Sequence, residues 1–567
     1  MLKWLNEDLR PTTLHKWGEI DLMVKIKFAD RAPLLCEKGT AVRELFTDAG
    51  YPQMKNAVAC RVNHLQRPLS WKLVMDSFVE PVTTDSIEGI EVYTRTVAFM
   101  LTAAATRIKG IRLHLTQSIS YSYYYESPEG EITQKDCLEI EAEMRRMVED
   151  CEPITREVFS ADEARAIMLK QRYADKERLI FYTGEDPVIL YKCCGVYDFF
   201  GGTLADSAGI TPTFELRSYR GGIFISGPTL ADPSHTMAFI ESPRLFSLID
   251  SHTDWLQKMR ISTVAEIHKH VVDGHSRDLI MSCEALHTKL LTNIAAQIEA
   301  HPDVRLLCLA GPSSSGKTTS SRRLRVQLLT SGINSATLEL DNYFVNRDKT
   351  PVGRDGKYDF EALEALDLEL INEQISELLE GREVEVPRFD FLAGRRTRGS
   401  RMKLAPGELL VIEGIHGLNE KLTERVAPEK KYKIFICPLT GTNIDFHNRI
   451  GTTDTRLLRR MVRDARKRGH SAEATLKMWP SVVRGSHRHI FPYQENADTL
   501  FNTSLAYEMS VLKGYVMPLL MTVGEDSPVF GEATRLLSLL QYVPVIPSDD
   551  VPNLSVLREF IGGSCFE

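Results

Sequence analysis

The chain has 567 residues, a mass of 64.1 kDa and a formal net charge of −8. At about 150 residues per domain, this length predicts three to four domains. Hydrophobic residues make up 43% and charged residues 26% of the chain, which excludes collagen-like, coiled-coil and wholly disordered proteins. The negative charge argues against a general nucleic-acid coat protein but is compatible with a local basic site.

Targeting and redox patterns point to the cytoplasm. The longest apolar run, residues 97–105, is about half of what a membrane-spanning helix needs. The N-terminus carries charges throughout and lacks the apolar core of a signal peptide. The 10 cysteines are scattered and form no CxxC pair, which favours reduced thiols. We therefore expect a cytoplasmic protein with no membrane partner.

The first half of the chain is predicted to hold two small units after an N-terminal extension at residues 1–22. Residues 23–88 form a β-rich unit, because VKIKF and VACRVN alternate at period two around the helical stretch AVRELFTDAG. Residues 89–245 form an α+β unit, with an alanine-rich helix at 94–108 and a charged helix at 137–150. In this unit the Ser/Tyr run SISYSYYYES is strand-like.

The second half changes pattern after a helical connector at residues 246–300, which Gly274 interrupts. In residues 301–515, helices alternate with short apolar runs at 304–310, 335–340, 409–414 and 432–437. This alternation predicts a parallel sheet with helices on both faces. Residues 516–567 are predicted to be a helical C-terminal extension that packs on this α/β domain.

A phosphate-binding loop is the clearest motif. Residues 311–318 read GPSSSGKT, which fits G-x-x-x-x-G-K-[ST] between an apolar strand and a helix. The glycines let backbone N–H groups surround phosphates, and the helix N-terminus adds positive potential. Lys317 is expected to reach the β- and γ-phosphates, and the Thr318 hydroxyl to ligate Mg²⁺. The predicted nucleotide-binding residues are Gly311, Ser313, Ser314, Ser315, Gly316, Lys317, Thr318 and Thr319.

Two acids follow predicted strands of the same sheet. Asp341 follows the run at 335–340, and Glu413 lies at the end of the run at 409–414. Ligands of open α/β sheets bind beyond the carboxyl ends of the strands, so both acids should face the phosphate loop. Asp341 is expected to orient or deprotonate an acceptor hydroxyl, and Glu413 to hold Mg²⁺ with Thr318. The alternative for each is a solvated acid at a strand end.

A basic helix is predicted further along the domain. Seven of the thirteen residues from 456 to 468 are Lys or Arg, and Arg456, Arg459, Arg460 and Arg463 share one helix face. Such a face could close over a triphosphate and neutralise the transferred phosphoryl group. The alternatives are a solvated face or a nucleic-acid patch.

The segment between Asp341 and Glu413 suits an acceptor site. It is long and polar, and it mixes acids, arginines and aromatic residues as a polyol or nucleoside site would. No N-K-x-D guanine-reading motif follows the loop, which disfavours a GTPase. The candidate acceptor-binding residues are Asp341, Tyr343, Asp359, Arg388 and Arg396.

Residues 301 to about 515 resemble the uridine kinase/phosphoribulokinase family of P-loop kinases. The matching motifs are GPSSSGKTT, DNYF, YDFEALEALD, VPRFDF, VIEGIHGL, RLLRRMVRDARKRG and ADTLFN. The resemblance implies ATP- and Mg²⁺-dependent phosphorylation of a hydroxyl on a nucleoside or sugar phosphate. It further implies that Lys317 and Asp341 are catalytic, that Asp359 holds ribose hydroxyls, and that Arg460, Arg463 and Arg468 are lid arginines.

The base-reading positions depart from the pyrimidine nucleoside kinases of this family. Those enzymes carry Tyr and His in the segment where this chain has Phe389 and Gly394. They also have a second lid arginine and a later glutamine where this chain has His470 and Met478. The kinase prediction stands, and the identity of the acceptor stays open.

The N-terminal half resembles the N-terminal region of threonyl-tRNA synthetase. Residues 23–88 resemble its TGS domain, a β-grasp module, and residues 89 to about 240 its second additional domain. That domain edits with a His-x-x-x-His and a Cys-x-x-x-His pair, and the matching positions here are Arg95, Phe99, Cys193 and Tyr197. Three of these four positions cannot hold zinc, so the resemblance implies that editing is lost. This domain order resembles a bacterial group of long uridine-kinase-like proteins.

The predicted fold is therefore multidomain: a β-grasp unit, an α+β editing-like unit and an α/β P-loop kinase with a parallel sheet. The predicted function is ATP-dependent transfer of the γ-phosphoryl group to a hydroxyl of a nucleoside or related sugar. One alternative is an RNA-associated P-loop ATPase or regulator, in which the synthetase-like half binds RNA. Another makes that half a scaffold or oligomerisation module, and RNA binding and homo-oligomerisation both stay open.

Overall fold

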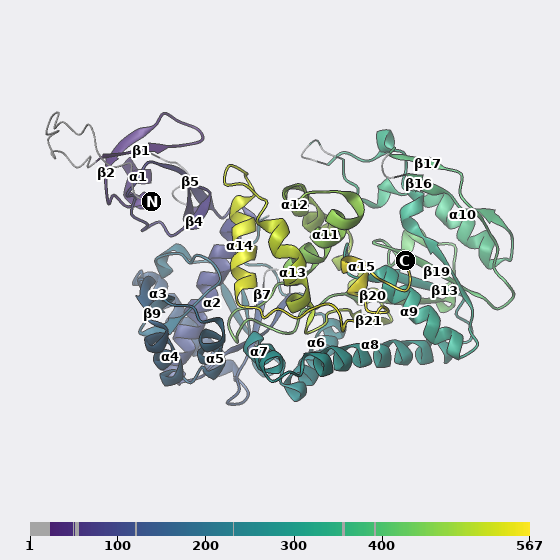
Figure 1. Ribbon diagram of the computed structural model, residues 1–567, viewed down its shortest axis with the longest axis horizontal. Coiled ribbons are helices and arrows are strands. Elements are labelled where there is room, and N and C mark those ends of the chain that lie inside the picture. The colour runs from purple at the N-terminus through teal and green to yellow at the C-terminus, as the bar shows by residue number, and fades with distance from the viewer. Residues whose placement is uncertain are drawn as a thin grey trace, which may run out of the picture.

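The computed structural model describes residues 23–48, 50, 56–119, 122–230, 232–353, 356, 358–390 and 393–567. The predicted extension at residues 1–22 lies outside these ranges. The N-terminal elements lie at one end of the molecule and the parallel sheet of the second half at the other (Figure 1). Helices α13 (Glu508–Leu520) and α14 (Phe530–Gln541) of the C-terminal part lie between them.

The first unit is a β-grasp. Its elements are β1 (Met23–Lys27), β2 (Leu34–Glu37), α1 (Val42–Asp48), β3 (Ala57–Val62), β4 (Leu65–Arg67) and β5 (Ser77–Thr83). The sheet order is β2-β1-β5-β3-β4, with β1 and β5 parallel at its centre. Val24 and Ile26 of β1 are buried against Phe46 of the helix, since alternate residues of the strand face the core.

The second unit is built on a long alanine-rich helix, α2 (Ile87–Lys109), as predicted. The Ser86 side chain caps its first turn, and Gly110 ends it in the left-handed conformation. Its other helices are α3 (Gln134–Glu149), α4 (Ala161–Lys170) and α5 (Ala174–Thr183). Its strands are β6 (His114–Ile119), β7 (Ser122–Glu126), β8 (Thr155–Phe159), β9 (Val188–Cys193), β10 (Val196–Asp198), β11 (Glu215–Tyr219) and β12 (Gly222–Ser226).

The strand-like Ser/Tyr run belongs to a pair of strands. The run spans the antiparallel strands β6 and β7, which pair from His114–Glu126 to Ile119–Ser122. In β7, Tyr124 and Tyr125 are both buried, which is consistent with the packing role of this strand.

The connector consists of three helices, α6 (Pro243–Met259), α7 (Val264–Val272) and α8 (Ser276–Glu299). Gly274 lies between α7 and α8 with a φ of 78°, so the predicted interruption is confirmed. Helix α8 then lies beside the parallel sheet, where Leu291 and Ile298 join the sheet's core.

The second half contains the predicted parallel sheet, in the order β14 (Ser335–Glu339), β19 (Leu409–Gly414), β13 (Leu306–Ala310), β20 (Lys431–Cys437) and β21 (Thr499–Asn502). Every neighbouring pair in it is parallel. Alternate residues of β13 enter two cores: one contains α8 and α9 (Lys317–Thr330), the other α10 (Leu368–Leu379). The predicted fold, a multidomain chain ending in an α/β P-loop domain, is confirmed.

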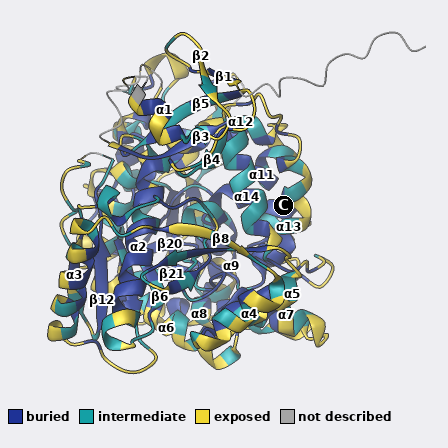
Figure 2. Cartoon of the chain, turned by 90° about the vertical axis from the view of Figure 1, so that its left-hand side faces the viewer, coloured by how far each residue is buried: buried dark blue, intermediate teal, exposed yellow. Residues whose placement is uncertain are grey.

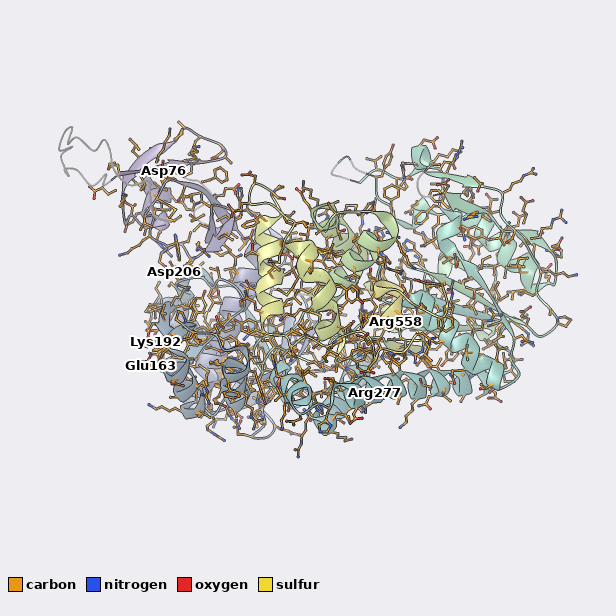
Figure 3. All side chains as sticks on the ribbon, viewed as in Figure 1. Asp76, Glu163, Lys192, Asp206, Arg277 and Arg558 are labelled. Atoms are coloured by element: carbon orange, nitrogen blue, oxygen red, sulfur yellow. The ribbon has the colours of Figure 1, made fainter. Side chains whose placement is uncertain are left out.

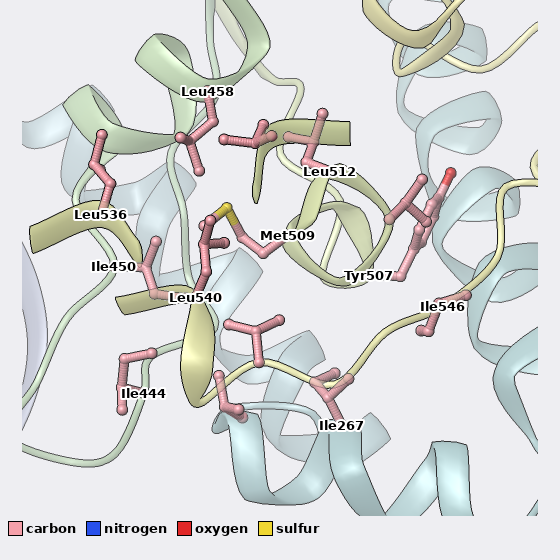
Figure 4. Packing of buried hydrophobic residues seen from close by; sticks show 14 of the residues in the cluster. Ile267, Ile444, Ile450, Leu458, Tyr507, Met509, Leu512, Leu536, Leu540 and Ile546 are labelled. Carbon is pink, nitrogen blue, oxygen red and sulfur yellow. The ribbon is translucent and has the colours of Figure 1, made fainter. Parts of the chain in front are cut away.

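The C-terminal residues share a core with several parts of the chain, which differs from simple packing on the α/β domain. This core contains side chains of α5, α7, α11 (Thr452–Arg468), α12 (Ala472–His489), α13 and α14 (Figure 4). Leu458, Met509, Leu536 and Ile546 all belong to it. Each of these segments has too small an apolar face to form a core alone, so together they join the two halves of the molecule.

Exposed and buried positions alternate around the surface helices, as in α4 (Figure 2), where Ala164 and Met168 face the interior. Over the ranges that the structure describes, no helix is both long and apolar enough to cross a membrane.

A buried network of charged side chains fixes the two halves to each other. Lys176 of α5 donates to Asp198 and to Asp445, each at 2.6 Å, and His447 contacts Asp198. All four side chains are at most 2% exposed. Burial lowers the pKa of Lys176, but the two aspartates more than offset this and hold it above its usual value. Asp445 and His447 belong to the loop between β20 and α11, so the N-terminal half anchors the loop that leads into the basic helix.

Candidate active site

The phosphate loop connects β13 to α9 at the carboxyl end of the central strand. Gly316 has a φ of 86°, which a residue with a side chain rarely adopts. Ser314 also has a positive φ, of 61°, and this strain marks a constrained loop. The side-chain hydroxyls of Ser314 and Ser315 are buried and have no hydrogen-bond partner among the described residues. A bound phosphate would satisfy them, so the loop fits the predicted nucleotide.

Thr318 and Glu413 meet at this loop. The Thr318 hydroxyl donates to Glu413 Oε1 at 2.9 Å, and the Glu413 side chain is almost fully buried. Burial raises the pKa of Glu413 to about 7, although the Lys317 ammonium opposes this. A hydroxyl and a carboxylate in contact are oxygen donors suited to Mg²⁺. Lys317 itself donates to the carbonyl oxygen of Pro312 at 3.3 Å.

Asp341 lies exposed at the end of β14, in the short helical turn Leu340–Tyr343. Its negative charge helps to raise the pKa of the Glu413 carboxyl, so the two predicted acids interact electrostatically in this region.

Glu361 also reaches this space and was missed in the sequence. Burial raises the pKa of Glu361, and the charges of Arg456, Arg460 and Lys317 oppose that rise. Its Oε2 atom is buried and has no hydrogen-bond partner among the described residues. It lies two residues after the predicted Asp359 in the same acidic motif, so the sequence pattern could have included it.

Two histidines, His489 and His416, lie near Asp359, which is a predicted acceptor-binding residue. Asp359 Oδ2 is 3.6 Å from His489 Nε2, and Asp359 Oδ1 accepts from the backbone N–H of Glu361 at 3.1 Å. The His416 side chain is 2% exposed, and its ring centroid lies 6.2 Å from that of His489. Burial and the neighbouring His489 lower the pKa of His416 to about 4. His416 is not among the site residues predicted from the sequence.

Three predicted acceptor residues have other partners or positions. Tyr343 is fully buried and donates to Gln374 Oε1 at 2.6 Å, so its ring is part of the core. Arg396 pairs with Asp367 at 2.8 Å. Arg388 lies exposed on the hairpin strand β16 (Arg388–Asp390). Of the predicted acceptor residues, Asp341 thus interacts electrostatically with Glu413 and Asp359 lies beside His489, whereas these three side chains have other partners or positions.

The basic helix lies against the phosphate loop. Arg456 and Arg459 are buried and donate to the carbonyl oxygens of Ser313 at 3.0 Å and Ser315 at 3.4 Å. Arg460 donates to the Ser313 hydroxyl at 3.1 Å. The predicted arginine face of the helix therefore contacts the phosphate loop. Its first two arginines bind backbone carbonyl oxygens of the loop, whereas a triphosphate was the predicted partner.

The three predicted lid arginines converge on one buried carboxylate, Asp464. It accepts from Arg460 at 3.1 Å and from Arg463 and Arg468 at 3.2 Å each. Asp464 is fully buried, and three guanidinium groups compensate its charge. It sets the orientation of a cluster of positive charge beside the loop.

Comparisons with known proteins place this domain in a family. Residues 306–507 match the model of the Phosphoribulokinase / Uridine kinase family. A uridine kinase from Halobacterium salinarum is 27% identical over 194 residues, which cover 34% of this chain and 77% of that protein. A solved structure of a possible uridine kinase from Bacillus stearothermophilus has 18% identity and a TM-score of 0.24, and covers 35% of this chain and 89% of its own.

The N-terminal region matches a different class of protein. A threonine–tRNA ligase from Thermotoga neapolitana is 30% identical over 206 residues, which are 35% of this chain. The match spans 31% of that ligase's length. The chain therefore carries a domain of the phosphoribulokinase and uridine kinase family, joined to an N-terminal region similar to that of threonine–tRNA ligases.

Proposed function

We propose that this protein is an ATP- and Mg²⁺-dependent kinase that phosphorylates a hydroxyl of a nucleoside or related sugar. The observation that carries this proposal is the meeting of Lys317, the Thr318–Glu413 pair and Arg460 at one end of the parallel sheet. The buried, unpaired hydroxyls of the loop add polar groups that match a triphosphate.

In the proposed reaction, some residues bind the nucleotide and Mg²⁺, and others neutralise charge on the transferred phosphoryl group. Thr318 and Glu413 would hold Mg²⁺, which supplies charge neutralisation between the phosphates. Lys317 and the arginines on Asp464 provide positive charge where the transferred group develops negative charge. Asp341 accepts the proton of the acceptor hydroxyl, and Glu361 accepts a hydrogen bond from the acceptor's sugar.

The proposal is tested by ADP release with a panel of nucleosides, ribulose 5-phosphate and tRNA as candidate acceptors. We expect ADP release to depend on one small-molecule acceptor, and the product to be heavier by one phosphoryl group. Release that RNA stimulates, without any phosphorylated small molecule, would contradict the proposal and favour an RNA-dependent ATPase.

The Glu413 carboxyl should give the reaction a characteristic dependence on pH. Its pKa of about 7 means that the carboxylate needed for Mg²⁺ forms as the pH rises through neutrality. Turnover should therefore rise between about pH 6 and pH 8. Glu413→Gln should lower turnover and remove this part of the profile, and an unchanged profile would show that another group titrates.

The same carboxyl should affect stability in the opposite direction. Its pKa is raised on folding from 4.5 to about 7, so its contribution is fully present below pH 4.5. That contribution is lost as the pH rises through about 7, where the buried group becomes charged. Urea titrations of the ligand-free protein should show this loss in the wild type and not in Glu413→Gln.

A further inference from the structure

A cavity of about 310 Å³ lies between the β-grasp unit, the α+β unit and helix α14, apart from the kinase site. Its volume is within the range of small-molecule sites. Hydrogen bonds fix two of its walls, since Thr203 donates from its N–H to Gln66 Oε1 and from its hydroxyl to the Gln66 carbonyl, each at 3.2 Å. The cavity is therefore set by specific contacts between the units.

Two arginines give this cavity unpaired positive charge. Arg67 and Arg156 both line it, and neither has an ion pair with a carboxylate among the described residues; the Arg67 guanidinium donates to the Gln66 carbonyl at 3.1 Å. Burial and the like charge of Arg156 lower the pKa of Arg67. A third lining arginine, Arg535, is neutralised by Asp454 and Glu532, at 2.6 and 2.7 Å. A phosphate that bound to both guanidinium groups would neutralise this like charge.

The rest of the lining mixes aromatic rings with aliphatic and small polar side chains. The Arg67 guanidinium lies 4.6 Å over the Trp71 ring, which holds its charge at the cavity. The Phe199 and Tyr542 rings, both in the lining, stack with centroids 5.9 Å apart. Glu185 is the acid of the lining. The walls thus combine two guanidinium groups with the aromatic side chains of Trp71, Tyr191, Phe200 and Tyr542.

We propose that this cavity binds a nucleoside monophosphate, with its phosphate on Arg67 and Arg156 and its base on the aromatic walls. Guanidinium groups bind phosphate oxygens in a fixed, bidentate geometry, which a pair of arginines reinforces. Residues of the β-grasp, the α+β unit and α14 all touch the cavity, so a bound nucleotide would also tie these three parts together.

The test measures binding of AMP, UMP and inorganic phosphate by calorimetry to the full chain carrying Lys317→Ala, which weakens binding at the phosphate loop. We expect a nucleoside monophosphate to bind this protein, and Arg67→Ala or Arg156→Ala to weaken that binding at least about tenfold. Arg156 is exposed, so the protein with Arg156→Ala should fold normally. The matched control is Arg61→Ala, in the same β-grasp sheet but paired with Glu80 and Glu88.

Two results would overturn this proposal. One is the absence of nucleotide binding, or binding that the Arg67 and Arg156 variants leave unchanged. The other is equally tight binding of inorganic phosphate, which would show that the aromatic walls contribute nothing and that the site does not select nucleotides.

A separate observation concerns the C-terminal segment, residues 548–567, which lies against the phosphate loop. The Glu559 carboxylate accepts from the Thr319 N–H at 3.2 Å and from the Thr319 hydroxyl at 2.8 Å. Val556 packs on the loop so closely that a Cβ at Gly316 would lie 2.5 Å from its Cγ1. The C-terminus and α15 (Arg558–Ile561) lie beside α9 and β13 (Figure 1).

Further contacts hold this segment between α9 and the basic helix. Glu567 pairs with Arg466 at 2.7 Å and Lys467 at 2.6 Å, which lowers its pKa to about 2. The guanidinium of Arg558, near the middle of the molecule (Figure 3), donates to the Ser548 carbonyl at 2.8 Å and folds the segment on itself.

We infer that Glu559 competes with the nucleotide, so that the segment restrains ATP binding until it is displaced. The N–H groups at the start of α9 attract anions, and Glu559 already places a carboxylate on one of them. A phosphate at the same N–H would have to replace that carboxylate. This inference rests on the proposed function, because it assumes that the loop binds ATP.

The test compares the dissociation constants of MgATP for the wild type and Glu559→Ala, by calorimetry on the full chain. We expect Glu559→Ala to bind MgATP several-fold more tightly, whereas Asp549→Ala, an exposed acid of the same segment, should match the wild type. Equal or weaker binding by Glu559→Ala would overturn the inference alone. Failure of both proteins to bind MgATP would overturn the proposed function as well.

Discussion

Replacing Lys317 by alanine should reduce kcat by about a thousandfold with the best acceptor of the panel. Phosphoryl transfer depends on positioning and on neutralising charge, and Lys317 is the ammonium at the centre of the phosphate loop. The Lys317 side chain makes one hydrogen bond to a loop carbonyl and is partly exposed, so its loss should leave the fold intact. The measurement is kcat from ADP release at saturating ATP.

The control for this prediction is Lys289→Ala. Lys289 is an exposed lysine of α8, so its removal should change kcat by less than about twofold. If Lys317→Ala kept turnover close to the wild type while its unfolding curve was unchanged, the loop would not be the site of phosphoryl transfer.

Replacing Lys176 by methionine should lower the free energy of unfolding by about 3 to 5 kcal/mol. The substitution leaves Asp198 and Asp445 buried without the ammonium that both contact at 2.6 Å. Removing one partner of a buried charge network costs far more than the network contributes as a whole, because the remaining charges lose their compensation. The measurement is urea unfolding followed by circular dichroism.

The matched control is Lys192→Met, on the surface of the same unit (Figure 3). Lys192 pairs with Glu157 at 3.5 Å, and the two side chains are 40% and 36% exposed. Exposed pairs of this kind contribute about 1 kcal/mol or less. Equal losses of stability in the two variants would contradict the role assigned to the buried network.

The parts of the site that are continuous in sequence could be predicted. The phosphate loop needs glycines at fixed spacing, a lysine and a hydroxyl residue between a strand and a helix, so 311–318 alone define it. Glu413 could also be predicted, because the carboxyl ends of parallel strands meet at one edge. The spacing of arginines in the basic helix predicted a shared face, and Arg456, Arg459 and Arg460 of that face contact the loop.

The parts that depend on partners distant in sequence could not be predicted. Glu559 reaches Thr319 across 240 residues, and no local pattern marks that contact. The motif predicted that Tyr343 binds the acceptor, but its hydroxyl donates a hydrogen bond to Gln374 in the core. Asp464 looked like one acid among many arginines, and only its complete burial shows that it orients them. Burial and tertiary hydrogen bonds decide these roles.

The link between the two halves has a consequence for the proposed kinase. Asp445 and His447 lie in the loop that precedes α11, and Lys176 and Asp198 hold this loop from the N-terminal half. Since α11 carries the arginines of the phosphate site, disturbing the network should also displace the site. We therefore expect Lys176→Met to lower kcat as well as stability.

The measurement that tests the central claim most directly follows the γ-phosphorus of labelled ATP in the presence of Mg²⁺ and the acceptor panel. The proposed function predicts that the label appears on one small hydroxyl compound, in an amount equal to the ADP formed, and that Lys317→Ala abolishes this transfer. Label found solely in inorganic phosphate, whatever acceptor or RNA is added, would contradict it.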